Sequence, residues 1–236
     1  MNILALDTSS QAASCALMRD NILHGEFFAN IGLTHSQTAM PMVEKLLAQT
    51  NTTLAEIDLF AVSTGPGSFT GLRIGVACVK GMALAGDKPC AGVSTLLALA
   101  AGVSVFAGYI CPVMDARREQ IYTALFESAD GQLGRLRQDE ALSLDELRRV
   151  LGALGPSPVL LVGDGAAIAS KALADLAHVG IAPERLLHQR ASAIAQIASQ
   201  MSADDQLTNA FDLAPSYLRL PQAERERLEA TGQKNH

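Results

Sequence analysis

Apolar residues in the first half of the chain form two kinds of pattern. Some lie in short continuous runs, and others recur every three or four residues. The runs are bounded by polar or glycine-containing turns and predict three strands, over 2–7, 14–18 and 22–28. The same criteria predict a helix over 35–49, a strand over 59–63, a helix over 71–84, a strand near Cys90 and a helix after Ser94. The predicted order of elements is therefore βββαβαβα.

The second half repeats this order. Ser143 and Glu146 form an S-x-x-E capping box, which predicts the start of a helix that runs through Leu151. The other predicted elements are strands over 108–115, "QIYTALFES" and 133–137, then a strand at "PVLLVGDG", a helix over 166–176, a short strand over 185–187 and a helix over 191–201. Each half opens on a strand that ends in an aspartate, Asp7 or Asp115, which indicates an internal duplication.

A duplicated βββαβαβα unit resembles the superfamily of actin, the Hsp70 ATPase domain and the sugar kinases. The resemblance implies an α/β fold with two tandem actin-like, ribonuclease-H-like domains, over 1–104 and 105–214, that flank a nucleotide cleft. The tail over 215–232 is expected to form a last helix that packs back on the first domain, because Pro221 suits a first helical position.

Composition narrows the classes of partner. A net charge of -6 and a pI near 5.3 argue against a chain that binds nucleic acid by itself, because such binding depends on lysine and arginine. The N-terminus lacks the charged start and long apolar run of a signal peptide, and no segment is expected to approach the length of a membrane span. We expect a cytoplasmic protein with no membrane partner, whose four cysteines are buried and reduced.

The glycine-rich stretch "GPGSFTG" over 65–71 precedes a predicted helix, as phosphate-binding loops do. It lacks the lysine of G-x-x-x-x-G-K-[ST], and its glycines do not fit G-x-G-x-x-G. Gly71 and Gly75 in the helix need compensation from close packing. That packing is either internal, against the sheet, or a helix-to-helix interface with a second chain.

Two predicted hairpin turns are candidate nucleotide sites. ATP-binding members of the superfamily read Asp-x-Gly-Thr at the first, where this chain has Asp7-Thr8-Ser9-Ser10, so a structural turn is favoured over a phosphate site. At the second, Asp115, Arg117, Arg118 and Glu119 could meet an anion or pair with one another on a solvated turn, and the pairing is favoured. Gly163 opens a strand-to-helix turn where relatives contact adenosine.

Catalytic and metal motifs are not apparent in the sequence. His35 has no second histidine at metal-binding spacing, since Ala39 stands four residues later, so we expect no metal. No Ser/His/Asp order, paired-carboxylate motif or nucleophile elbow is visible.

The segments "ILALDTSS", "GLTHSQTAMPMVEKLL", "DLFAVSTGPGSFTGLRIGVACVKGMALA", "GVSTL", "MDARREQIY" and "PSYLR" closely resemble the TsaB (YeaZ) family. The resemblance covers nearly the whole chain, and the "GPGSFTGLRIG" block is highly specific. It implies a non-catalytic scaffold that activates the TsaD transferase. That enzyme forms threonylcarbamoyladenosine next to the anticodon of tRNAs that read A-starting codons, with the ATPase TsaE and downstream of TsaC.

The resemblance also implies a site. The helices over 35–49 and 71–84 would form a bundle with TsaD, through His35, Met40, Val43, Leu47, Gly71, Arg73, Gly75, Cys78 and Met82. The same face could support a homodimer in isolation. Gly75→Leu is expected to weaken the heterodimer without unfolding the chain.

No cofactor is expected on the isolated chain, and ATP or ADP at the complex interface is a candidate, with vestigial contacts at Asp7, Thr8, Asp115, Arg117 and Gly163. Contact with tRNA is expected only through the complex. Two alternatives stay open: an independent ATP-dependent enzyme that uses the interdomain cleft, and a metallopeptidase, which the missing histidine pair makes the poorer choice.

Overall fold

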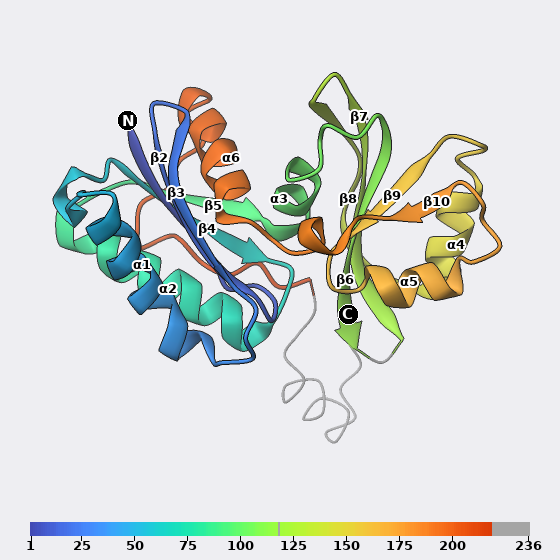
Figure 1. Cartoon of the computed structure of the whole chain (residues 1–236), viewed down its shortest axis with the longest axis horizontal. Coiled ribbons are helices and arrows are strands. Elements are labelled where there is room, and N and C mark those ends of the chain that lie inside the picture. Colours follow the sequence, from blue (N-terminus) through green and yellow to red (C-terminus); the bar gives the residue numbers. More distant parts are fainter. Residues whose placement is uncertain (118, 219–236) are drawn as a thin grey trace.

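The computed structural model describes residues 1–117 and 119–218, which form two lobes side by side (Figure 1). Each lobe is built on a five-stranded mixed sheet, with strand orders β3-β2-β1-β4-β5 and β10-β9-β6-β7-β8. The predicted α/β class and the order βββαβαβα in each half are confirmed. Arg118 and most of the predicted tail helix, 219–232, lie outside the described residues.

The first half of the chain contains β1 (Asn2–Asp7), β2 (Ala13–Arg19), β3 (Ile22–Ala29), α1 (His35–Gln49), η1 (Leu54–Glu56), β4 (Leu59–Gly65), α2 (Phe69–Gly86), β5 (Cys90–Ser94) and α3 (Thr95–Ala101). The second half contains β6 (Gly108–Arg117), β7 (Gln120–Ala129), β8 (Gln132–Ser143), α4 (Leu144–Gly152), β9 (Val159–Val162), α5 (Ala166–Ala172), β10 (Val179–Ile181), η2 (Glu184–Leu186) and α6 (Ala191–Ala203).

The first sheet is covered on both faces, which explains why its strands are nearly continuous apolar runs. On β1, Leu4 and Leu6 face the core under α1 and α2, whereas Ile3 and Ala5 face the core under α6. Figure 1 shows α1 and α2 on one side of this sheet and α6 on the other. The first lobe is therefore a three-layer α/β/α unit.

Two helices cross between the halves of the chain. α3 follows the first sheet in sequence, but its Leu96 and Leu99 pack against β6 and β7 of the second sheet. α6 follows the second sheet, yet its start is held on the first, because the Ala191 N–H donates to Ser14 Oγ at 3.0 Å and the Ser192 N–H donates to Glu26 Oε1 at 2.9 Å. The limits of 1–104 and 105–214 stay a prediction, and this packing runs across them.

Several predicted elements differ from the structure. The expected strand over 185–187 is wrong, because the 3-10 helix η2 occupies most of it and the edge strand is β10, six residues earlier in the chain. Strand β8 is longer than 133–137, because its half-buried second half also pairs with β7. Helix α5 ends at Ala172 rather than at 176, and residues 215–218, the described start of the expected tail helix, are not helical.

Helix α2 is long and apolar enough to cross a membrane, with 18 residues and a mean hydropathy of 1.2. The expectation that no segment approaches the length of a membrane span is therefore wrong for this helix. Its inward residues Leu72, Val76 and Val79 are buried against the first sheet, and core helices of globular domains commonly meet the same criterion.

Candidate functional site

A cleft of about 510 Å³ lies where the two lobes meet. Its walls are the turn after β1, the turn before α2, the β6–β7 hairpin, the turn after β9 and the segment near residue 217. Among its lining residues are Ser9, Ser10, Gly67, Phe69, Thr70, Asp115, Arg117, Tyr122, Asp164 and Tyr217. Of the five predicted nucleotide contacts, only Asp115 and Arg117 line this cleft. Asp7, Thr8 and Gly163 are buried and do not line it.

The turn after β1 is packed into the protein. Asp7 Oδ1 accepts hydrogen bonds from Ser9 N and Ser9 Oγ, both at 2.9 Å, and Thr8 Oγ1 donates to Gly71 O at 2.8 Å. The Ser68 N–H donates to Ser9 O at 2.7 Å. A phosphate cradle needs free N–H groups aimed at the ligand. These two N–H groups are already used within the chain, so they are not free to bind a nucleotide phosphate.

The glycines of the turn before α2 are explained by the same contact. A Cβ atom on Gly67 would lie 2.4 Å from Ser9 O, and one on Gly71 would lie 2.0 Å from Thr8 O. On Gly75 it would lie 2.3 Å from Thr8 Oγ1. Gly71 and Gly75 therefore let α2 pack closely on the first hairpin, and of the two alternatives drawn from sequence the internal one accounts for them. We expect Gly75→Leu to destabilise the chain, so it is not a clean test of docking.

His35 and Asp7 lie around the same turn. His35 Nε2 is 2.7 Å from Ser10 O, which makes Nε2–H the donor to a backbone carbonyl. Burial raises the pKa of the Asp7 carboxyl, and the hydrogen bonds from Ser9 offset part of that rise. Among residues 1–117 and 119–218, no three His, Cys, Asp or Glu side chains are grouped so that they could hold a metal ion.

The β6–β7 hairpin on the opposite wall is open to the cleft. Arg117 has a positive φ of 65°, its N–H donates to Asp115 Oδ1 at 2.8 Å, and its Nη1 lies 3.8 Å from Asp115 Oδ2. Arg117 therefore pairs with Asp115 on the turn, which is the arrangement that the sequence favoured over an anion-binding site. Asp164 Oδ1 accepts from Asp115 N at 3.2 Å, and desolvation in the cleft, together with the nearby Asp115 carboxylate, raises the pKa of Asp164.

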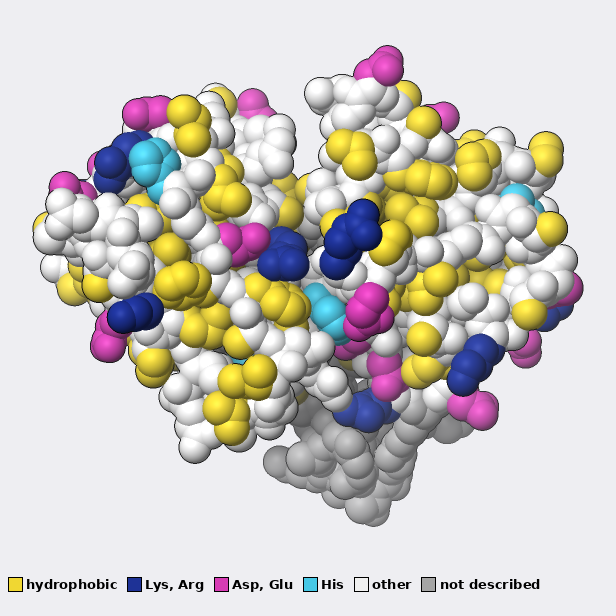
Figure 2. Space-filling model, in the orientation of Figure 1, with side chains coloured by type: hydrophobic (Ala, Val, Ile, Leu, Met, Phe, Trp, Pro, Cys, Tyr) yellow, Lys and Arg dark blue, Asp and Glu magenta, His cyan; other side chains and the backbone are white. Residues whose placement is uncertain are grey.

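Gln189 joins the two lobes behind the cleft. Its side chain is buried, Oε1 accepts from Ser10 Oγ at 2.9 Å, and Nε2 lies 3.8 Å from Met114 Sδ. The first hairpin turn and β6 are thus linked through one amide. Charged side chains and a histidine gather on the surface where the lobes meet (Figure 2). On either side of Gln189 in the sequence, His188 Nε2 lies 3.8 Å from Glu184 Oε1 and Arg190 Nη1 lies 3.7 Å from Glu26 Oε2. Sequence reasoning missed Gln189, because nothing near it in the chain marks it.

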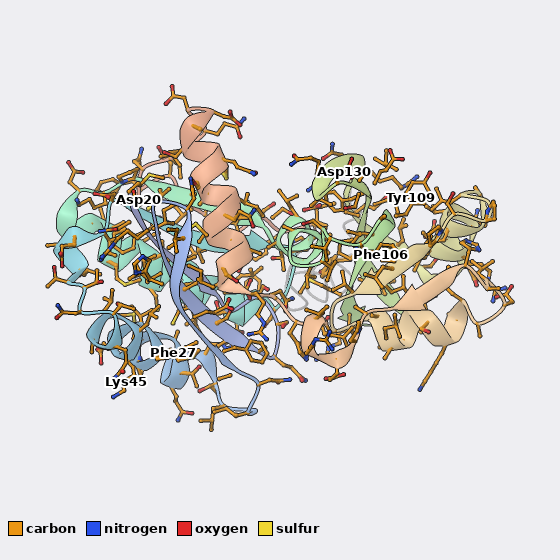
Figure 3. All side chains as sticks on the ribbon, turned by 45° about the horizontal axis from the view of Figure 1, so that its top comes forward. Asp20, Phe27, Lys45, Phe106, Tyr109 and Asp130 are labelled. Carbon is orange, nitrogen blue, oxygen red and sulfur yellow. The ribbon has the colours of Figure 1, made fainter. Side chains whose placement is uncertain are left out.

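The outer face of α1 and α2 is the second candidate region. Among the nine predicted interface residues, Val43, Gly71, Gly75 and Met82 are buried in the chain's own core, and only Arg73 is exposed. The others, His35, Met40, Leu47 and Cys78, are half-buried. Figure 3 shows Lys45 projecting outward from α1, on the side away from the sheet.

Exposed positions on α2 form a row that sequence reasoning did not separate from the buried one. Arg73, Ala77, Gly81 and Ala85 are all exposed and recur every four residues, so they share one helix face. A Cβ atom added to Gly81 would meet nothing within 4 Å. We call these four residues the outer row of α2. Its small side chains would let a second helix approach closely, which is a property that the buried glycines cannot supply.

Comparison with known proteins finds one matching family model and several relatives of similar sequence. A family model described as TsaD, tRNA N6-adenosine threonylcarbamoyltransferase, matches residues 32–226. The tRNA threonylcarbamoyladenosine biosynthesis protein TsaB of Bacillus subtilis is 33% identical over 234 residues, which cover 98% of this chain and 99% of that protein. The TsaB protein of Escherichia coli is 35% identical over 149 residues, which cover 62% of this chain and 64% of that protein.

Solved structures agree on the fold. YeaZ from Pseudomonas aeruginosa aligns with a TM-score of 0.79 and 27% identity, covering 92% of this chain and 99% of that chain. The activator of 2-hydroxyisocaproyl-CoA dehydratase from Clostridium difficile, a structure with bound ADPNP, aligns with a TM-score of 0.50 and 13% identity, covering 87% and 97%. At that identity the likeness shows the fold alone.

Proposed function

The chain belongs to the TsaB (YeaZ) family of tRNA threonylcarbamoyladenosine biosynthesis proteins, in the actin-like superfamily, and we propose that it acts as the non-catalytic partner of a TsaD transferase. In this role it would activate TsaD, together with the ATPase TsaE and downstream of TsaC. It would meet tRNA only within the complex, in the cytoplasm.

The observation that carries this proposal is the contrast between the cleft and the outer row of α2. In the cleft, the N–H groups of Ser9 and Ser68 are bound to the chain's own oxygen atoms. On α2, an 18-residue helix leaves small side chains exposed along one face. Exposed small residues permit close helix-to-helix packing, which suits docking better than it suits chemistry.

The packed first turn also bears on nucleotide binding. We propose that the isolated chain binds no ATP at its first hairpin, and that a nucleotide, if the complex holds one, depends on the partner. An independent ATP-dependent enzyme would have to place phosphates against the packed turn at Thr8. Direct titration of the isolated chain with ATP and ADP separates these alternatives, because tight binding would favour the independent enzyme.

The main test is a reconstituted threonylcarbamoylation reaction. Purified tRNA, threonine, bicarbonate and ATP are incubated with TsaC, TsaD and TsaE, with and without this chain. We expect product to depend on the chain, while the chain alone turns over no ATP. Equal product in its absence would remove the activating role.

A variant pair tests the docking face. Gly81→Leu places a large side chain in the outer row of α2, where there is open space, so the isolated chain should fold at least as well as the parent. We expect its affinity for TsaD, measured by calorimetry, to fall about tenfold or more. The matched control is Gly152→Leu at the end of α4, which is also exposed with open space around it and should bind TsaD as the parent does.

A further inference from the structure

Arg73 is held in place by two aromatic rings. Its guanidinium carbon lies 3.8 Å from the centre of the Phe69 ring and 5.9 Å from the centre of the Tyr217 ring. Arg73 Nε donates to Tyr217 Oη at 2.9 Å. The two rings are tilted, with centres 5.0 Å apart. The cluster therefore joins the start of α2 to the segment 215–218. Tyr217 lies 144 residues after Arg73 in the sequence.

The two terminal nitrogens of the Arg73 guanidinium have no partner among the described residues. Within the part of the chain that the structure describes, Nη1 and Nη2 make no hydrogen bond or ion pair. An arginine normally loses side-chain freedom when it binds, but stacking on Phe69 and the bond to Tyr217 restrict Arg73 beforehand. A planar pair of N–H groups held in this way matches the two oxygens of an oxyanion.

The charge around Arg73 favours an anionic group. Helix α2 contains two charged residues, Arg73 and Lys80, and both are cations. Lys80 Nζ donates to Phe211 O at 2.9 Å and to Leu213 O at 3.1 Å, so its ammonium is engaged within the chain. Arg73 is left as the exposed cation of this helix, on a protein whose net charge is -6.

Arg73 also stands at one end of the outer row of α2. Ala77 and Gly81 follow it by four and eight residues, so a chain that packs along the small residues would reach the guanidinium. Arginine is enriched at protein interfaces and among the residues whose loss weakens binding most.

We propose that Arg73, clamped by Phe69 and Tyr217, binds a carboxylate side chain of the protein that docks on α2. The inference rests on the proposed docking function and adds the chemistry of the contact. It also gives Tyr217 a role, which is to fix the orientation of the guanidinium rather than to touch the partner's carboxylate.

The test compares three variants in calorimetric titrations with TsaD, at low and high salt. Arg73→Lys keeps the charge but loses the planar pair of donors, and we expect affinity to fall about 10- to 100-fold. Tyr217→Phe keeps the ring but loses the hydroxyl, and we expect a fall of about 3- to 10-fold with an unchanged thermal midpoint. Arg149→Lys, on the exposed side of α4, is the matched control and should bind normally.

The outcomes separate this inference from the docking proposal. If Gly81→Leu weakens binding while Arg73→Lys and Tyr217→Phe do not, the docking face stands and the carboxylate contact is wrong. If the parent chain does not bind TsaD, the docking function itself fails. Inorganic phosphate or ADP binding to the isolated chain that is lost in Arg73→Lys would assign the clamp to phosphate and overturn the carboxylate.

Discussion

The two hairpin turns that face each other across the cleft have the same place in the two lobes but different surroundings. The turn at Thr8 and Ser9 is buried beneath the start of α2, whereas the turn at Arg117 is exposed. In each lobe a glycine lets the following helix approach the end of the first strand, since a Cβ atom on Gly67 would meet Ser9 O and one on Gly163 would meet Val113 O. A duplicated topology thus need not preserve a duplicated site.

The two turns also differ in what supports them. In the first lobe, backbone groups and Thr8 satisfy the turn from within the chain. In the second lobe, the carboxylate of Asp164 supplies the equivalent support and the turn itself stays polar and open. The first lobe gains a rigid base for α2, and the outer row of that helix is presented on it.

The largest expected effect comes from breaking the packing of the first turn. Gly75→Leu forces a side chain against Thr8 and Val62, and we expect the free energy of unfolding to fall by about 3 kcal/mol. Gly81→Leu, six residues later in the same helix but in open space, should leave it unchanged or raise it by about 0.5–1 kcal/mol. Urea unfolding followed by circular dichroism measures both, and equal midpoints would contradict the packed turn.

A smaller effect is expected from the buried carboxyl of the same turn. Because burial raises the pKa of Asp7 above its ordinary value of 3.8, the folded state holds the proton more tightly than the unfolded state. Stability is therefore lost as pH rises from about 4 through the raised pKa, and it stays lower above it. We expect Asp7→Asn to be more stable than the parent at pH 7–8, with the difference shrinking towards pH 4.

Thermal midpoints across that pH range measure the effect. Asn can still accept the two hydrogen bonds from Ser9, so the turn should survive the substitution. Asp164→Asn sharpens the comparison between lobes, because its carboxyl lines the cleft and should show a weaker gain. A parent that is more stable than Asp7→Asn at neutral pH would mean that the charged form of Asp7 is stabilised in the fold.

The smallest effect concerns how the first helix of each lobe begins. At α4, Ser143 Oγ accepts from Glu146 N at 3.2 Å and Glu146 Oε2 accepts from Ser143 N at 2.9 Å. Thr34 at the start of α1 makes no side-chain cap hydrogen bond. Ser143→Ala should cost about 1 kcal/mol, and Thr34→Ala should cost little by calorimetry. Equal losses would show that the capping box adds nothing.

Much of the fold could be predicted from local sequence patterns. Strand β1, helix α1 and the capping box of α4 depend on residues within a few positions, and all three were predicted from sequence. The role of Gly75 depends on Thr8, which lies far away in the chain, so spacing alone could only leave two alternatives. Gln189 has no local signal at all, because its hydrogen-bonding partner belongs to the other end of the chain.

The prediction of a strand over 185–187 was wrong for a similar reason. The short edge strand β10 pairs in parallel with β9, and that pairing selects Val179–Ile181 over the apolar residues that follow. Such a choice depends on the neighbouring strand, which a single-sequence pattern does not contain. The outer row of α2 was not separated from the buried glycines of the same helix, because sequence gives spacing but not which helix face points to the sheet.

Helices α3 and α6 each pack on the lobe to which the other half of the chain contributes the sheet, and this affects how the chain folds during its synthesis. During synthesis the first sheet is complete by Ser94, but one of its faces waits for α6, about a hundred residues later. Until Ala191–Ala203 leave the ribosome, Ile3, Ala5 and Leu59 lack the cover of α6 on that side. The nascent chain therefore carries an apolar surface while about a hundred further residues are made, and neither half can finish its core alone.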